Sequence, residues 1–293
     1  MRVLTAHKEP VRCLAYSRDG TLLASGGDGQ AIVLWSATAQ VPLARLEGHS
    51  DWVRDLAFSP DGRQLASAGW DDTVRLWSIS KRRQKAQLAG YAGGAWSLAF
   101  APEGVLAAGA GDGTVRVHRT LDDRNPLTVR AHRWPVAALA FTPDGRTLAT
   151  ASHDRSVQLW DSVWGKRQAT LGSHTDWVRT VDTAPTGGLL ASGGDDGKVM
   201  VCRVQGASPQ GTLEGHRAPV ARVAFCPDGR GLVSVSWDGT ARLWDARTGR
   251  ERSAYAWEAG RLLSLAVSPD GMTAAAGAEN GTIIIWDLDP MDG

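Results

Sequence analysis

The chain has 293 residues, of which 43% are apolar and 22% charged, and its formal net charge is +1. Such a chain is globular and long enough to bury a large core, and it has no bulk charge that would draw it to nucleic acid or to an anionic membrane. Because the N-terminal stretch MRVLTAHKEP lacks the apolar run of a secretory signal and the three cysteines show no CxxC spacing, we expect a cytoplasmic protein.

A turn of the Pro-Asp-Gly type recurs along the whole chain, at steps of 41 or 42 residues. The copies are SRDG (17–20), SPDG (59–62), APEG (101–104), TPDG (142–145), APTG (184–187), CPDG (226–229) and SPDG (268–271). Proline at the second turn position and glycine at the fourth favour a tight reversal, so each copy predicts a hairpin connection. Seven similar units therefore fill the chain, and we predict one domain over residues 1–293.

The second unit illustrates the elements expected around each turn. The segment VRDLAF (53–58) precedes the turn, and its step of three residues between apolar Val53 and Leu56 predicts a β-bulge. The segments QLASAG (64–69), TVRLWS (73–78) and KAQLAG (85–90) follow. Short alternating segments without a helical period predict an all-β fold with four strands in each unit.

The ends of the chain indicate how the units assemble. One four-stranded sheet exposes two apolar faces, so it must stack on its neighbours, and regular turn spacing is typical of a propeller, sandwich or barrel. Seven sheets stacked radially form a closed ring. The last unit stops after its third strand at Trp286 and Asp287, so we predict that residues 2–6 supply its fourth strand and leave no free edge.

Two dipeptides recur in register with the turns. Gly48-His49 opens the second unit and Trp77-Ser78 closes its third strand, and corresponding pairs flank the sixth unit. With seven registered copies, residues 1–289 resemble the WD-repeat (WD40) family. The resemblance implies a seven-bladed β-propeller with four antiparallel strands per blade. Its opening positions are residues 7, 49, 91, 132, 174, 216 and 258.

The resemblance also implies a buried hydrogen-bonded set in each blade: His in the opening loop, Ser or Thr on the second strand, Asp in the next turn and Trp on the third strand. Complete sets are His49, Ser67, Asp71 and Trp77; His132, Thr150, Asp154 and Trp160; and His216, Ser234, Asp238 and Trp244. The other units are incomplete: Gly29 replaces Asp, Cys202 replaces Trp, the third unit keeps only Asp112, and the seventh has Glu258 and Asn280.

The repeated Ser, His and Asp residues have an alternative interpretation as a hydrolase triad or as metal ligands. A triad needs one open site, whereas these sets recur every 42 residues or so between strands expected to be buried. The histidines also lack the short spacings of zinc motifs. We therefore expect the sets to be structural, with no catalytic residue, no metal site and no cofactor.

The tetrapeptide DWVR occurs at residues 51–54 and again at 176–179. The resemblance places the third and fifth residues after each opening position, and the residue before each turn Asp, on the rim of the central channel. Several of these positions hold Trp or Arg, the types enriched at interface hot spots. The predicted partner-binding rim is Arg12, Asp28, Trp52, Arg54, Trp70, Trp96, His153, Trp177, Arg179, Asp195, Trp237 and Arg261. Alternatively, some of these tryptophans only pack against a neighbouring blade.

These observations predict a monomeric, non-catalytic scaffold that binds a protein or peptide on the rim, with no nucleic-acid or membrane partner. One alternative is an enzyme or ligand sensor that uses the channel-mouth carboxylates Asp28, Asp195 and Glu279. Another is nucleic-acid binding by base stacking on the rim tryptophans and arginines. Trp164 leaves open a second binding surface on the opposite face.

Overall fold

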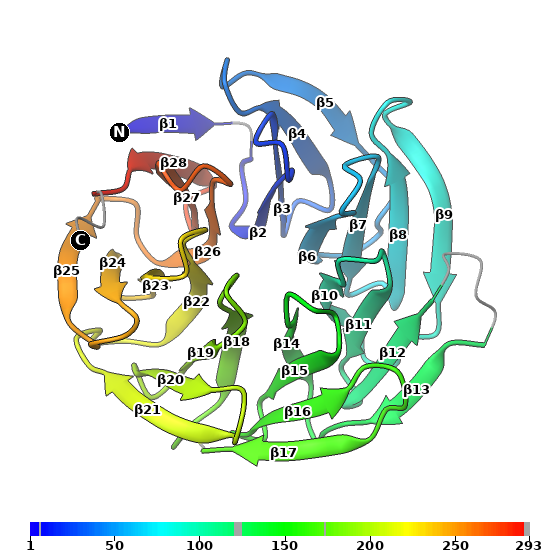
Figure 1. Cartoon of the computed structure of the whole chain (residues 1–293). Coiled ribbons are helices and arrows are strands. Elements are labelled where there is room, and N and C mark those ends of the chain that lie inside the picture. Colours follow the sequence, from blue (N-terminus) through cyan, green and yellow to red (C-terminus); the bar gives the residue numbers. More distant parts are fainter. Residues whose placement is uncertain (6, 120–124, 173, 290–293) are drawn as a thin grey trace.

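The computed structural model describes residues 1–5, 7–119, 125–172 and 174–289. Within these ranges the chain forms 28 strands in seven four-stranded antiparallel sheets, arranged as blades around a central axis (Figure 1). This confirms the predicted all-β, seven-bladed propeller. The described residues contain no helix of sufficient length and apolar character to cross a membrane.

The strands follow the seven sequence units. The first three blades contain β2 (Val11–Tyr16), β3 (Leu22–Gly27), β4 (Ile32–Ser36) and β5 (Pro42–Leu46); β6 (Val53–Phe58), β7 (Gln64–Gly69), β8 (Thr73–Ser78) and β9 (Arg83–Ala89); and β10 (Ala95–Phe100), β11 (Leu106–Ala110), β12 (Thr114–His118) and β13 (Leu127–Arg130). The next two contain β14 (Val136–Phe141), β15 (Thr147–Ser152), β16 (Val157–Asp161) and β17 (Arg167–Leu171); and β18 (Val178–Thr183), β19 (Leu189–Gly194), β20 (Val199–Arg203) and β21 (Ser208–Leu213). The last two contain β22 (Val220–Phe225), β23 (Gly231–Ser236), β24 (Thr240–Asp245) and β25 (Glu251–Ala256); and β26 (Leu262–Val267), β27 (Thr273–Ala278), β28 (Thr282–Asp287) and β1 (Arg2–Thr5).

The second blade matches the prediction except in its outermost strand. Strands β6, β7 and β8 have the expected bounds, whereas β9 covers Arg83–Ala89 instead of residues 85–90. The strand ends before Gly90 because that residue has φ of 90°, which extended backbone does not adopt. It begins earlier because Arg83 and Gln84 continue the pairing with β8.

A β-bulge interrupts the innermost strand of each of the seven blades. In β6, Val53 pairs with Gly69 and Asp55 pairs with Ala68, so Arg54 is left without a partner residue. The predicted bulge is therefore present. The corresponding unpaired residues are Arg12, Trp96, Ala137, Arg179, Ala221 and Leu263. Because a bulge redirects the side chain of its extra residue, these positions are turned away from the regular pattern of the sheet.

The N-terminal strand closes the ring, as predicted. Strand β1 pairs antiparallel with β28 and lies beside it in Figure 1. Leu4 is 7% exposed and packs among Val11, Ile283 and Ile285, whereas its neighbour Val3 is 49% exposed. Of the predicted residues 2–6, Ala6 lies outside the described residues. One face of β1 thus completes the seventh blade and buries apolar surface between the first and last units.

Adjacent blades share their apolar cores. Cys13 and Leu34 of the first blade, for example, belong to one buried cluster with Leu65 and Trp77 of the second. Side-chain hydrogen bonds reinforce this packing: the Ser97 hydroxyl donates to the Val136 carbonyl oxygen at 2.8 Å. The ring is consequently a rigid frame on which the inner strands position their first residues.

Candidate interaction site at the channel mouth

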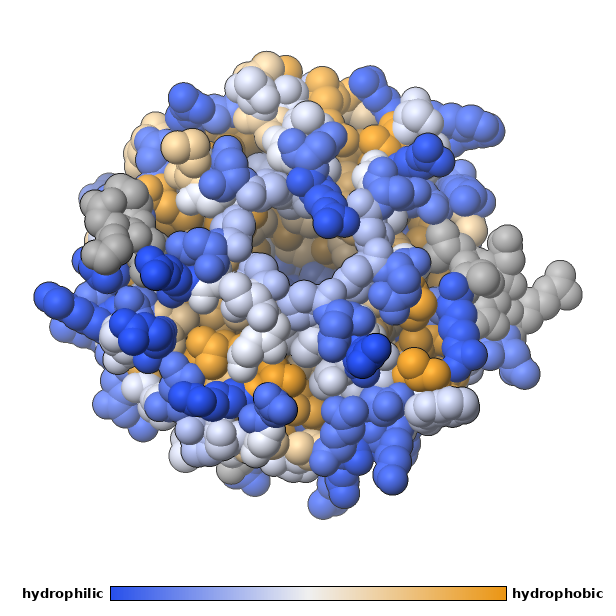
Figure 2. Space-filling model, in the orientation of Figure 1, coloured by the Kyte–Doolittle hydropathy of each residue, from blue (hydrophilic) through white to orange (hydrophobic). Residues whose placement is uncertain are grey.

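The unpaired bulge residues meet around the mouth of the central channel. All seven of them line one cavity of about 60 Å³, together with His153, Arg222 and Trp237. Figure 2 shows the hollow at the centre of the ring. The bulge at the start of each inner strand is therefore what delivers these side chains to a common site.

Five aromatic rings form a continuous row from the second blade to the fifth, which we call the aromatic arc. Trp52 stacks on Trp70 with ring centroids 4.6 Å apart and an interplanar angle of 15°. Trp70 contacts Trp96 at 5.8 Å, and Trp96 meets His153 edge-on at 5.2 Å. His153 then stacks on Trp177 at 4.4 Å. Such pairs add stabilisation beyond the apolar area that they bury.

Arginine side chains lie over tryptophan rings at both ends and in the middle of the aromatic arc, and also over Trp237, which is outside the arc. The distances from guanidinium carbon to ring centroid are 4.7 Å for Arg12 over Trp52, 4.6 Å for Arg54 over Trp96 and 5.9 Å for Arg179 over Trp177. Over Trp237 they are 4.4 Å for Arg179 and 5.1 Å for Arg261. These are cation–π contacts, which orient the guanidinium groups as well as stabilising them.

Carboxylates complete the arrangement. Asp28 accepts two hydrogen bonds from Arg12, and Asp195 accepts two from Arg179, with Nη2 to Oδ2 distances of 2.9 Å and 2.7 Å respectively. Bidentate pairs of this kind fix the plane of the guanidinium group. All twelve residues of the predicted rim are therefore joined in one connected series of side-chain contacts.

Two glycines of the third blade make room for the arc. A Cβ atom on Gly94 would lie 2.9 Å from Cδ1 of Trp70, and φ of Gly94 is 91°. A Cβ atom on Gly111 would lie 2.0 Å from the Gly93 carbonyl oxygen and 2.9 Å from Nε1 of Trp96. The indole of Trp96 is further held by a 2.8 Å hydrogen bond from Nε1 to the Gly93 carbonyl oxygen. Small residues at these positions thus allow Trp70 and Trp96 to approach each other.

The five rim tryptophans differ in exposure. Trp177 is 46% exposed, whereas Trp52, Trp70, Trp96 and Trp237 are half-buried. These four pack against neighbouring side chains, as the alternative interpretation of the rim proposed, and only part of each is open to a partner.

A further tryptophan, which is not among the predicted rim residues, extends the exposed aromatic surface. Trp134 is 60% exposed and lines a groove of about 380 Å³ with Trp177 and His153. It occupies the second position after the opening histidine, where the other units have Glu9, Asp51, Gly93, Asp176, Ala218 and Gly260. The sequence signal that could have identified Trp134 was an aromatic residue at a position that is small or acidic in the other units.

His153 connects the arc to this groove. Burial, together with the nearby charges of Arg179 and Arg54, lowers the pKa of His153 to about 4. The imidazole is therefore neutral near neutral pH and acts as a flat ring between Trp96 and Trp177.

The His-Ser-Asp-Trp sets form the expected hydrogen bonds inside the blades. His49 Nε2 lies 2.7 Å from the Ser67 hydroxyl and its Nδ1 lies 2.9 Å from Asp71, while Trp77 Nε1 donates to Ser67 at 2.8 Å. The same connections occur in the fourth and sixth blades. Both Ser67 and His49 are buried, and burial lowers the pKa of His49. The serine hydroxyl is therefore part of the interior of the blade.

Two incomplete blades show how a set is replaced. In the third blade, Tyr91 takes the histidine position and His118 takes the tryptophan position, and Tyr91 Oη lies 2.8 Å from His118 Nε2. In the seventh blade, Ala276 takes the serine position. Trp286 Nε1 is consequently buried without a hydrogen-bond partner among the described residues, although Trp257 packs on its ring at 4.8 Å.

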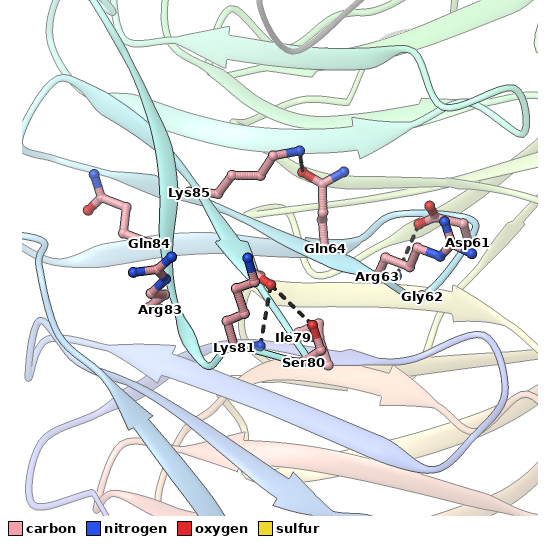
Figure 3. Close-up of a pocket in the computed structure, with 11 residues that line it drawn as sticks. Asp61, Gly62, Arg63, Gln64, Ile79, Ser80, Lys81, Arg83, Gln84 and Lys85 are labelled. Carbon is pink, nitrogen blue, oxygen red and sulfur yellow. Dashed lines mark hydrogen bonds between the residues drawn. The ribbon is translucent and has the colours of Figure 1, made fainter.

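A larger open groove lies at the turn end of the second blade, at the opposite end of β6 from the rim (Figure 3). Arg63, Lys81, Arg83 and Lys85 line it, and Lys85 Nζ donates to Gln64 Oε1 at 3.2 Å. These basic side chains are exposed and no aromatic ring lines the groove, so it offers no rigid anchor. Trp164 is 78% exposed.

Within the described ranges, no group of three His, Cys, Asp or Glu side chains is placed to hold a metal ion. The repeated blades, their interior hydrogen-bonded sets and the closure by β1 define a seven-bladed β-propeller built from homologous units. The family model for the WD domain, G-beta repeat, matches residues 1–36, 40–78, 82–119, 124–161, 165–202, 207–245 and 254–287. The chain belongs to the WD40 repeat family, whose propellers are generally protein-interaction scaffolds and typically non-catalytic.

Proposed function

We propose that this propeller is a non-catalytic scaffold that binds an extended segment of a partner protein across the channel mouth. The observation that carries the proposal is the aromatic arc with its stacked arginines, which ends in the groove between exposed Trp134 and Trp177. Exposed tryptophans beside ordered arginines are the residue types that contribute most to protein interfaces.

The rigidity of the rim favours binding. Arg12 and Arg179 are each held by a tryptophan ring on one side and by a carboxylate on the other. Side chains that are already ordered lose little conformational entropy when a partner docks, so more of the contact energy is retained as affinity. The partner would supply apolar groups for the exposed indoles and polar groups for the ends of the arc.

The same contacts weigh against the alternative functions. Asp28 and Asp195 are engaged in bidentate pairs with arginine, so their oxygen atoms are already occupied by hydrogen bonds and are not open to a substrate. These pairs also neutralise Arg12 and Arg179, so the rim offers little net positive charge to a phosphate backbone. We therefore favour a peptide over a small substrate or a nucleic acid.

Affinity capture from an extract of the source cells tests this function. We compare the wild-type chain with a Trp134→Ala/Trp177→Ala variant and with Trp164→Ala, a matched control at an exposed indole on the opposite face. Loss of a hot-spot pair is expected to weaken partner retention by at least about 30-fold, while Trp164→Ala retains it. Equal capture by all three folded proteins would show that the rim is not the binding surface.

We also propose that the protein is a cytoplasmic monomer. Cys13, Cys202 and Cys226 are buried free thiols, and burial raises the pKa of Cys226 to about 12, so these thiols are protected from disulfide exchange. Sedimentation equilibrium should give a mass near 31.2 kDa. A concentration-independent mass of twice that value would contradict the monomer.

A further inference from the structure

The channel-mouth cavity has an imbalance of charge. Four guanidinium groups line it, those of Arg12, Arg54, Arg179 and Arg222. Three have a carboxylate partner: Asp28 for Arg12, Asp195 for Arg179, and Asp55 for Arg222 at 3.0 Å across the ring. Arg54 forms no ion pair with any residue that the structure describes.

The surroundings of Arg54 compensate its charge only in part. Its guanidinium lies between the rings of Trp70 and Trp96, at 5.5 Å and 4.6 Å from their centroids. Its buried Nε has no hydrogen-bond acceptor among the described residues, and neither does the buried Nε1 of Trp70. A desolvated cation without a counter-ion is unfavourable, and cation–π contacts recover only a fraction of that cost.

The pKa of Arg54 shows the same imbalance. Burial and the nearby cations Arg12, Arg222 and Arg179 lower this pKa to about 10. The side chain still carries its charge near neutral pH, in a cavity whose other three cations are already paired.

We propose that the channel mouth is a carboxylate subsite, in which an aspartate or glutamate side chain of the docked segment accepts hydrogen bonds from the guanidinium of Arg54. The proposal rests on the function proposed above, since the rim holds the segment that delivers this side chain. A cavity of about 60 Å³ accommodates a small head group of this kind. The single unpaired guanidinium matches a monoanion, whereas a dianionic phosphate would be repelled by Asp28, Asp55 and Asp195.

A first experiment tests the subsite without any partner. The chain is labelled with ¹⁵N-arginine and titrated with sodium acetate at constant ionic strength, and the Arg54 Nε–H signal is assigned by its loss in Arg54→Gln. We expect a saturable shift of this signal and none for Arg217, an exposed arginine on the same end of the ring. A shift that is absent, or shared equally by both arginines, would overturn the subsite. If inorganic phosphate shifts the Arg54 signal at lower concentration than acetate, the assignment of the subsite to a carboxylate would be overturned.

A second experiment tests the docked segment. Random peptides displayed with their C-termini blocked are selected on the wild-type chain, and those that require Trp134 and Trp177 are retained. We expect the selected peptides to share one acidic residue. Its change to Asn or Gln should weaken binding of the peptide to the wild-type chain about 10- to 100-fold. The same change should weaken binding to the Arg54→Gln variant less than about twofold. Arg217→Gln serves as the matched control and should behave as the wild type.

The two proposals fail in different ways. Peptides that need both exposed tryptophans but no acidic residue would leave the rim function standing and overturn the carboxylate subsite. A saturable acetate shift at Arg54 without any rim-dependent peptide would support the subsite and contradict the rim function. The acetate titration is measured on the unaltered chain and uses Arg54→Gln only to assign one signal, so it remains decisive if that variant is folded but less stable.

Discussion

The imidazole of His153 lies flat against the indole of Trp177, with ring planes 8° from parallel and centroids 4.4 Å apart. The two residues belong to neighbouring blades, and the contact joins the half-buried part of the aromatic arc to its exposed end. Because the positive groups of Arg179 and Arg54 face the same imidazole, protonation of His153 would place a third cation there. Protonation of His153 is therefore unfavourable in the folded protein.

The stability of the propeller should carry a His153 contribution that depends on pH. The pKa is about 4 in the fold against 6.5 for an ordinary histidine, so between these values the unfolded chain binds a proton that the folded chain does not. The free energy of unfolding should therefore decrease as pH falls from about 6.5 towards about 4. His153→Gln removes this proton, so urea unfolding should show a shallower loss of stability for the variant over that window. His7, whose pKa is also lowered to about 4, contributes equally to both proteins. Parallel pH profiles would contradict the assignment.

The ring closure by β1 can be tested with two adjacent residues. Leu4 is buried between the first and last blades and Val3 points to solvent. Leu4→Ala should lower the free energy of unfolding by about 2–4 kcal/mol, because it leaves a cavity in a shared core, whereas Val3→Ala should change it by about 0.5 kcal/mol or less. Denaturant unfolding measures both. Equal effects of the two substitutions would show that β1 does not close the ring through Leu4. Deletion of residues 1–6 removes the whole strand and should destabilise the whole ring.

The hydrogen bond between Tyr91 and His118 in the third blade should stabilise the fold as an ordinary buried hydrogen bond does. Tyr91→Phe keeps the ring and removes only the hydroxyl that lies 2.8 Å from His118 Nε2, so we expect a loss of about 1–3 kcal/mol in the free energy of unfolding. Affinity for rim-dependent peptides should be unchanged. Tyr255→Phe, at a partly exposed tyrosine whose hydroxyl bonds to Asp289, is the control and should cost less. A thermal midpoint equal to that of the wild type would exclude a stabilising role for the Tyr91 hydroxyl.

The seventh blade should gain stability from a single oxygen atom. Ala276→Ser places a hydroxyl at the position where Ser67 and Ser234 accept a hydrogen bond from the blade tryptophan, at 2.8 Å in each case. Because Trp286 Nε1 is buried and without a described partner, we expect a gain of about 1 kcal/mol. Calorimetry measures the stability of Ala276→Ser and of Ala108→Ser, the equivalent change in the third blade, where no tryptophan occupies the third strand. The difference between the two variants separates the new hydrogen bond from the general effect of replacing Ala with Ser. Destabilisation by Ala276→Ser would indicate that the site has no room for the hydroxyl.

Several features of the fold follow from spacing along the chain. Turns repeated every 41 or 42 residues and short alternating segments predicted the strands of the second blade, and the step between Val53 and Leu56 predicted its bulge. These are local properties, because a turn and the pleat of a strand are determined by neighbouring residues. The missing strand after Trp286 similarly predicted the closure by β1. The sets around Ser67, Thr150 and Ser234, by contrast, were implied by the resemblance to the WD-repeat family.

The exposure and the contacts of each rim side chain were decided only by the closed ring. The resemblance to the WD-repeat family placed Trp52 and Trp177 at equivalent rim positions, yet Trp52 is half-buried and Trp177 is 46% exposed, since each depends on what the adjacent blade presents. Trp134 became part of the site through the same neighbour relations. Asp55 pairs with Arg222, 167 residues away, and Arg54 has no ion-pair partner in the part of the chain that the structure describes. Neither fact has a counterpart in local spacing. Contacts across the channel arise only when all the blades share one axis, so their charge balance belongs to the tertiary structure.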